Sequence, residues 1–457
     1  MRKLIFISSF LSVFFISAQN KQILYDFANL PQTLLLNPAV DFQGKFHIGV
    51  PGFSQLSLHG GFSGFSVYDL LAADDVSIND KIATIYKGLG KTEFFSFNQQ
   101  MELLNIGFRL KNNSYVSAGY YQELDILFKF PKDMIDLYYE GNTMVNRRYS
   151  VNKLAGQAEL LGVFHVGISR KVNEFTRIGL RAKIYSSVAS ASTKRNSGFF
   201  YTEEGTDNIY KQHLSNVDLF LETSGIVLPS DVEVDQSYIQ GQFLFGGNLG
   251  VGLDVGFTYA PKEAWEITGS IQDFGFIYYT KNVESHRIRG SYELEGFQLD
   301  FDPATPDTYW TDLKDDFKDR IARDTIYSNY INFRPMKLNA SISYSFGRKR
   351  ADDCSFMNKV SPYAHKVGGH LFSRLNVVHS YIAATVFYER RFGKSLATKI
   401  TYTADPFSYA NVGLGVSLRA GAFNIYAMAD NLLGFKNVYA MQSANVQLGM
   451  NFIFGAF

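Results

Sequence analysis

Alternation between apolar residues and polar or small residues runs through most of this chain, and it restricts the fold more than any other feature. In residues 244–259, one set of alternate positions is mostly apolar while the other carries Asn, Gly, Asp and Thr. Successive side chains of a β-strand point to opposite faces, so this pattern predicts strands with two different faces. The same alternation returns in residues 176–188, 337–346 and 410–419. We therefore expect an all-β protein.

Fourteen segments fit this pattern, and the connections between them alternate in length. The predicted strands are 55–63, 95–110, 114–124, 159–172, 175–192, 244–259, 264–280, 335–346, 362–372, 381–392, 395–403, 410–419, 423–432 and 444–454. Short turns such as 173–174 alternate with long connections such as 193–243 and 281–334. Short periplasmic turns and longer extracellular loops are typical of a transmembrane β-barrel. We predict an antiparallel barrel of about 14 strands, within a range of about 12 to 16.

The first residues have the pattern of a secretory signal peptide. Arg2 and Lys3 precede an apolar run over residues 4–16, which is shorter than the ~20 residues of a transmembrane helix. Small residues follow, so we expect cleavage after Ala18, with residues 1–18 as the signal peptide. The protein is therefore expected to leave the cytoplasm.

The last residues point to the outer membrane. Residues 444–457 alternate between apolar residues and Asn, Gln and Gly, and the chain ends on Phe457. Such a strand resembles the C-terminal signal that the barrel assembly machinery reads in bacterial outer-membrane proteins. We therefore expect a barrel in the outer membrane, with membrane lipid as its surroundings and the assembly machinery as a partner during biogenesis.

Composition excludes several other classes of protein. Aromatic residues make up 16% of the chain and the mean hydropathy is −0.08, which argues against disorder and against a bundle of transmembrane helices. The net charge of +1 offers no basic surface, so nucleic acid is not an expected partner. The single Cys354 rules out an internal disulfide framework and a site built from several cysteines.

Three short motifs resemble known families of outer-membrane proteins. Residues 36–39, Leu-Asn-Pro-Ala, resemble an N-terminal element of FadL-like transporters and of the PorP/SprF-type proteins linked to type IX secretion. Residues 271–277 and 430–433 resemble a Bacteroidota family of outer-membrane proteins of unknown function. The resemblance implies a FadL-like barrel, residues 55–457, whose N-terminal segment, residues 19–54, enters or plugs the lumen. It implies no substrate and no binding residues.

Two features of the connections complete the expected architecture. An extra strand over residues 45–50, or a periplasmic extension, is the alternative to a plug. Short helices are expected in two long loops, over residues 81–90 and 132–141, because each has a start signal in front and Gly at its end. The plug motif comprises Asn37, Pro38 and Ala39.

Charged and amide residues gather on the polar face of the predicted strands, which we expect to line the lumen. On the lipid face, each charge would cost about 2–4 kcal/mol near the midplane. A lumen of mixed charge fits a hydrated pore, or a salt-bridged interior around a plug, better than a conduit for hydrophobic cargo. The predicted lumen-facing residues are Asn105, Arg109, Arg177, Arg181, Lys183, Asp254, Glu266, Glu389, Arg391, Lys399, Arg419 and Asp430.

The sequence offers no clear catalytic, cofactor or metal site. No Ser-His-Asp group or nucleophile elbow stands out, so we expect neither enzyme activity nor a cofactor. The spacing of His365, His370 and His379 does not place two zinc ligands on one helical face. Acidic residues crowd residues 300–319, but their spacing does not match a regular calcium loop, and a solvated loop is the simpler interpretation.

Two functions remain open. A transporter or channel for a small solute, either hydrophobic or polar, would need an open or gated path, and the resemblance to FadL-like proteins favours it. The alternative is a non-conducting subunit of an outer-membrane secretion, assembly or gliding complex. Such a subunit would need a sealed lumen and a surface for partner proteins.

Overall fold

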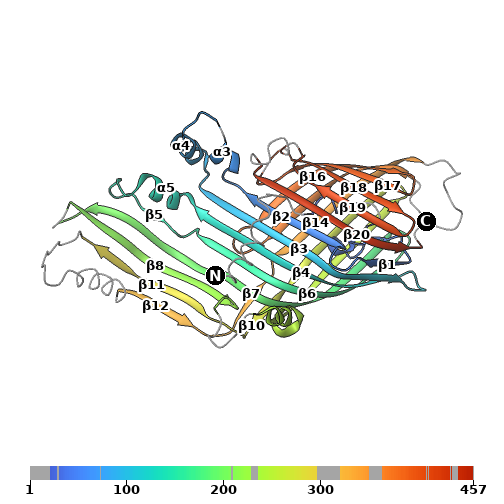
Figure 1. The fold of residues 1–457 in the computed structure, drawn as a ribbon, viewed down its shortest axis with the longest axis horizontal. Helices are drawn as coiled ribbons and strands as arrows, with labels where there is room; N and C mark the ends of the chain where they lie inside the picture. The colour runs from blue at the N-terminus through green and yellow to red at the C-terminus, as the bar shows by residue number, and fades with distance from the viewer. Residues whose placement is uncertain are drawn as a thin grey trace.

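A ring of antiparallel strands makes up most of the protein, described here from a computed structural model (Figure 1). Its strands are β1 (Phe46–Gly49), β2 (Gln55–Phe62), β3 (Thr92–Arg109), β4 (Tyr115–Pro131), β6 (Ala155–Lys171), β7 (Thr176–Glu204), β9 (Asn248–Lys262), β10 (Trp265–Tyr279), β14 (Met336–Arg348), β15 (Tyr363–Leu375), β16 (Tyr381–Phe392), β17 (Leu396–Ala404), β18 (Asn411–Ala420), β19 (Phe423–Ala429) and β20 (Ser443–Phe454). The short β1 and β2 both lie between β3 and β20 and share one position. The ring is therefore a closed barrel of 14 antiparallel strands, as predicted.

The structure describes most of the chain but not all of it. Several predictions fall outside the described part: the signal peptide with its cleavage after Ala18, Cys354, the acidic residues 300–319, and Phe457. The described residues are 21–27, 30–72, 74–206, 209–227, 235–295, 320–348, 363–407, 409, 411–432, 434 and 441–455.

Each of the fourteen predicted segments contains one barrel strand, but some of the predicted ends are wrong. β4 and β7 continue to Pro131 and Glu204, past the predicted ends at 124 and 192. In this part of β7 the exposed residues include Lys194 and Arg195, and in β4 the inward face carries the buried Leu127 while Phe128 stays exposed. The contrast between an apolar face and a polar face, on which the prediction depends, is therefore lost. Residues 244–247, predicted as the start of a strand, instead form a turn in front of β9.

The outward face of the barrel is apolar and exposed. On β7, Ile178, Leu180 and Ile184 are each more than 40% exposed, whereas Arg181 and Lys183 between them are buried. A continuous exposed apolar surface is rare on soluble monomers. An apolar outer band of this kind is how a barrel meets lipid.

Helices contribute little to this architecture. Within the described ranges, no helix combines the length and the apolar character needed to cross a membrane.

A sheet extends past one end of the barrel. After residue 187, β7 exchanges its partner β9 for β8 (Tyr210–Ser224). β8 pairs with β11 (Ser285–Leu294), which pairs with β12 (Ile321–Ile326). Figure 1 shows this sheet on the left, away from most of the barrel. We call it the sheet extension. It lies in connections for which we predicted no strands, because its strands lack a regular alternation between exposed apolar and buried polar residues.

Several short elements complete the chain. The helices α4 and α5 confirm the two predicted loop helices within a few residues, whereas α3 was not predicted. Their bounds, with those of the remaining short strands, are α3 (Val67–Leu71), α4 (Ile78–Gly88), α5 (Lys132–Glu140), β5 (Tyr149–Ser150) and β13 (Tyr330–Phe333).

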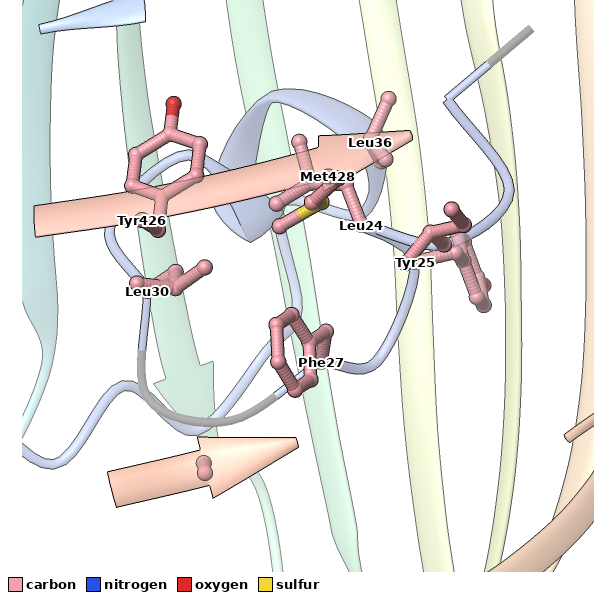
Figure 2. Close-up of a cluster of buried hydrophobic side chains, with 9 residues drawn as sticks. Leu24, Tyr25, Phe27, Leu30, Leu36, Tyr426 and Met428 are labelled. Carbon is pink, nitrogen blue, oxygen red and sulfur yellow. The ribbon is translucent and has the colours of Figure 1, made fainter. Parts of the chain in front are cut away.

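Residues 21–27 and 30–45, which we call the N-terminal segment, lie inside the barrel and include the single-turn α2 (Thr33–Leu36). Figure 2 shows this segment passing in front of the inner faces of the strands. Its apolar side chains form a buried cluster with side chains of the wall. The cluster contains Ile23, Leu24, Tyr25, Phe27, Leu30 and Leu36 from the segment and Ala397, Tyr426 and Met428 from the wall. Full burial of side chains of this size contributes about 1.5–3 kcal/mol each.

The outward register can be tested at Leu180. We expect Leu180→Arg to lower the free energy of unfolding by about 2–4 kcal/mol, because the charge would face the hydrocarbon. Unfolding by guanidinium in phospholipid vesicles measures this change. Leu180→Met is the matched control and should have little effect. Equal stability of the Arg and Met variants would contradict the assignment of this face to lipid.

Candidate functional site

Carbonyl groups of the N-terminal segment accept hydrogen bonds from inward-facing side chains of the wall. The bonds run from Lys399 to Tyr25 (2.5 Å), from Ser270 to Leu36 (2.6 Å) and from Thr258 to Ala39 (3.1 Å). A buried carbonyl without a partner costs free energy comparable to a lost hydrogen bond. Strands β17, β10 and β9 therefore fix the path of the segment.

The Asn-Pro-Ala turn approaches the backbone of two strands at glycines. A Cβ atom on Gly179 of β7 would overlap the carbonyl group of Pro38, and one on Gly256 of β9 would overlap the side-chain oxygen of Asn37. That oxygen also accepts a hydrogen bond of 2.9 Å from the N–H of Ala39, which closes the turn. Glycine is the residue that lets a backbone approach this closely.

Charged side chains on several strands, all but one of them buried, meet beside the N-terminal segment. We define the ion cluster as Glu123, Glu159, Lys183, Asp273, Arg334 and Lys337, from β4, β6, β7, β10, the residues before β14, and β14. The Nζ atom of Lys183 lies 2.6 Å from one carboxylate oxygen of Asp273, and that of Lys337 lies 2.9 Å from the other. Arg334 pairs with Glu123 at 2.8 Å and also with Glu159. Isolated charges at this depth would cost several kcal/mol each, so the pairs hold these strands in one arrangement.

The residues predicted to face the lumen differ in burial. Asn105, Arg177, Arg181, Lys183, Asp254, Glu389, Lys399 and Asp430 are buried, whereas Arg109, Glu266, Arg391 and Arg419 are partly exposed. Two groups of them each gather around a single aspartate. Lys183 and Arg181 lie 2.9 Å and 3.6 Å from Asp254. Arg177 and Arg109 lie 2.7 Å and 3.8 Å from Asp41 of the N-terminal segment.

Among the other predicted residues, Glu389, Arg391 and Lys399 lie near one another. Lys366 connects this third group to Glu266. The partners of the other predicted residues are His47 and Glu102 for Asn105, Lys366 for Glu266, Glu389 for Arg391, Tyr25 for Lys399, the carbonyl of Ile453 for Arg419, and Asn445 for Asp430. Most of these contacts join neighbouring strands or hold the N-terminal segment. Such contacts show that side chains and the N-terminal segment fill the interior of the barrel.

Sequence reasoning missed all of the ion cluster except Lys183. β10 has a bulge between Ile271 and Phe274, and Asp273 adopts a φ of +59° there. As a result Gln272 and Asp273 are both buried, which breaks the alternation used for prediction. Glu123 and Glu159 share the inward face with large apolar residues, so this face does not appear polar in the sequence. An isolated acid within an aromatic strand is the signal that would have identified them.

The outer wall has an apolar hollow where the pairing of β10 is interrupted. β10 pairs with β14 as far as Gln272 and with β13 from Phe276 onward. Pro335, between β13 and β14, has no N–H to donate. This hollow, which we call the wall hollow, has a volume of about 780 Å³. Its apolar lining includes Val251, Leu253, Phe274, Phe276, Phe333 and Val377.

A much smaller polar cavity lies on the other side of the same wall. It has a volume of about 30 Å³, enough for roughly one water molecule. Lys21, Lys183 and Lys337 line it, and burial lowers the pKa of Lys21 to about 8. Asp273 lines both this cavity and the wall hollow. The ion cluster therefore stands between the polar interior and the apolar hollow.

The close packing of the Asn-Pro-Ala turn against β7 can be tested at Gly179. We expect Gly179→Ala to displace the turn, because its Cβ atom would overlap Pro38. Faster hydrogen exchange of the amides of residues 33–42 would report this displacement. Gly369→Ala on β15 is the matched control, since the nearest atom to its Cβ would be 4.0 Å away. Unchanged exchange in the Gly179 variant would contradict the close packing.

Three solved structures with a similar fold are distant from this chain in sequence. The toluene transporter TbuX of Ralstonia pickettii has 9% identity and a TM-score of 0.45, over 97% of this chain and 100% of that chain. A FadL homologue of Pseudomonas aeruginosa has 10% identity and a TM-score of 0.45, over 94% and 95%. The translocator domain of the autotransporter NalP from Neisseria meningitidis has 8% identity and a TM-score of 0.30, over 90% and 88%. Because these TM-scores are below 0.5, the similarity says nothing about function.

Comparison with protein-family models identifies the family of this chain. No curated protein matches it. The model of a family of unknown function, DUF5723, matches residues 38–430, which is most of the chain. The chain belongs to this family.

Proposed function

We propose that this protein is an outer-membrane transporter for a small apolar solute and that the wall hollow is where the solute binds. The observation that carries the proposal is the chemistry of the hollow. Sites for small molecules are mostly apolar volumes of about 300–1,000 Å³ with a few polar groups. The wall hollow has this size, an apolar lining, and Asp273 and Arg334 as polar groups.

The position of the hollow supports the same proposal. It opens among side chains of the lipid-facing surface, of which Phe274 is 67% exposed and Phe333 is 69% exposed. An apolar solute partitions into lipid, so a site in the wall is reached without crossing water. A polar solute would instead need the lumen, where the N-terminal segment and paired charges occupy the space. These contrasts favour an apolar solute.

In this proposal the N-terminal segment acts as a plug. Its apolar cluster with the wall and its hydrogen bonds to three strands support that role. The outer-membrane location rests on the closed barrel, its apolar outer band and the expected signal peptide.

The sheet extension favours a second function. It projects beyond the barrel and ends at β12, which pairs with β11 alone among the strands that the structure describes. An extension of this kind would suit a non-conducting subunit that holds partner proteins in an outer-membrane complex. A structural subunit would not bind or carry an apolar probe, so the first test below separates the two functions.

The wall hollow can be tested by filling it. Val377 lies in the lining and is 84% exposed, so Val377→Trp should occupy part of the volume. We expect weaker binding and slower uptake of a fluorescent naphthylamine probe by vesicles that carry the variant. Ile382→Trp is the matched control, because Ile382 is 66% exposed on the outward face of β16 but does not line the hollow. Identical uptake by both variants and the unaltered protein would contradict the proposal.

The plug can be tested by conductance in planar bilayers. We expect the unaltered protein to show little conductance, because the N-terminal segment fills the lumen. A variant that lacks residues 21–45 should form open channels, because a barrel of about 14 strands is too wide for its side chains alone to fill. Equal conductance of the two proteins would contradict the role of the segment as a plug.

A further inference from the structure

The turn in front of β9 lies against the outside of the barrel wall. The helix α6 (Gln236–Gly241) runs directly into this turn, residues 242–246. In Figure 1 it is the yellow-green helix at the lower edge of the barrel. The hydroxyl of Tyr120 donates a hydrogen bond of 3.0 Å to the carbonyl of Phe243. The hydroxyl of Ser186 donates one of 2.6 Å to the carbonyl of Gln242.

Both hydroxyl groups come from the outward face of the barrel. Along β4 and β7, the neighbours Tyr121 and Tyr185 are buried in the interior, so Tyr120 and Ser186 point outward. Strand β6 lies between β4 and β7. The turn therefore covers the outer surface of three adjacent strands.

The wall is shaped to receive the turn. Gly162 of β6 lies beneath it, and a Cβ atom there would be 2.5 Å from the carbonyl oxygen of Phe243. The rings of Phe164 and Phe245 meet edge to face at 6.4 Å. Lys281 donates a hydrogen bond of 2.6 Å to the carbonyl of Gly246. The polar backbone of the turn is thus held by the wall and by the connection that follows β10.

Two side chains of the turn stay exposed beside these contacts. Leu244 is 61% exposed and Phe245 is 45% exposed. Phe245 has a φ of +68°, a left-handed conformation that costs a non-glycine residue roughly 1–2 kcal/mol. Glycine would remove that cost. A phenylalanine held in this conformation and exposed suggests that its ring has a role outside the protein.

We propose that Leu244 and Phe245, together with Ile239 of α6, form a membrane anchor that inserts into the lipid leaflet around the barrel. Irregular backbone beside lipid is tolerated where its polar groups have partners. Three carbonyls of the turn have them, from Tyr120, Ser186 and Lys281. The partner is lipid, because the exposed side chains continue into the apolar band of β9, where Leu249 is 47% exposed and Val251 is 54% exposed.

This anchor is independent of transport, but it acts beside the proposed transport site. Val251 and Leu253 of β9 line the wall hollow, and β9 begins immediately after the turn. Insertion of the turn would fix the height of β9 in the membrane. It would thereby hold the wall hollow at a constant depth in the leaflet.

Fluorescence quenching by labelled lipid tests the anchor. The variant Leu244→Cys, in a Cys354→Ser background, would carry an environment-sensitive fluorophore in phosphatidylcholine vesicles. Some of the lipids would bear a nitroxide on the acyl chain near the headgroup. We expect quenching several-fold greater than for a label at Ile209→Cys, which is 79% exposed immediately before β8 of the sheet extension. A label at Leu180→Cys in the apolar band is the positive control.

A second site keeps the test decisive if one variant fails to fold. Phe245→Cys carries the same label on the neighbouring residue, and folding of each variant is checked by its mobility in unheated and heated detergent gels. Quenching at both sites comparable to Leu180 supports the anchor. Quenching no greater than at Ile209, in folded protein, overturns it and assigns the turn to water or to a partner protein.

Discussion

Backbone hydrogen bonding beside lipid is the constraint on which the rest of this structure depends. With no water in the hydrocarbon region, every N–H and C=O group of a spanning strand needs a partner in the protein. Closure of the strands into a ring supplies these partners along the regular parts of the wall. The irregular parts of the wall need other hydrogen-bond donors and acceptors. At each such place these come from nearby side chains or backbone groups.

Three irregular places show how this is done. At the bulge of β10, the N–H of Asp273 bonds the carboxylate of Asp254 at 2.8 Å. Beside Pro335, the N–H of Arg334 bonds the carbonyl of Gly275 at 3.0 Å, which bridges the interrupted strands. At the turn before β9, side chains of the wall bond the free carbonyls. The first two places border the wall hollow, and the third is the proposed anchor. Both candidate functional sites therefore lie where the regular hydrogen bonding between neighbouring strands is interrupted.

Sequence patterns could predict the regularly paired strands of the barrel but not the places where their pairing is interrupted. The alternation of Ile178, Leu180 and Ile184 with Arg181 and Lys183 arises because one face meets lipid and the other meets the lumen. That physical cause holds along the whole membrane-spanning part, so fourteen strands could be found from it. It is absent from the sheet extension, which projects beyond the barrel, and β8, β11 and β12 were not predicted. It fails locally at Asp273, because a bulge places two successive residues on one face.

The interior charges and the exterior hollow meet at the bulge of β10. An ordinary strand would send Asp273 outward after the inward Gln272, and a carboxylate facing lipid would be costly. The bulge turns Asp273 inward instead, where Lys183 and Lys337 neutralise it. The pairing between β10 and β14 also ends at this level, beside Pro335. Asp273 lines both the polar cavity and the wall hollow, so a single bulged residue borders the paired charges of the interior on one side and the apolar surface of the wall on the other.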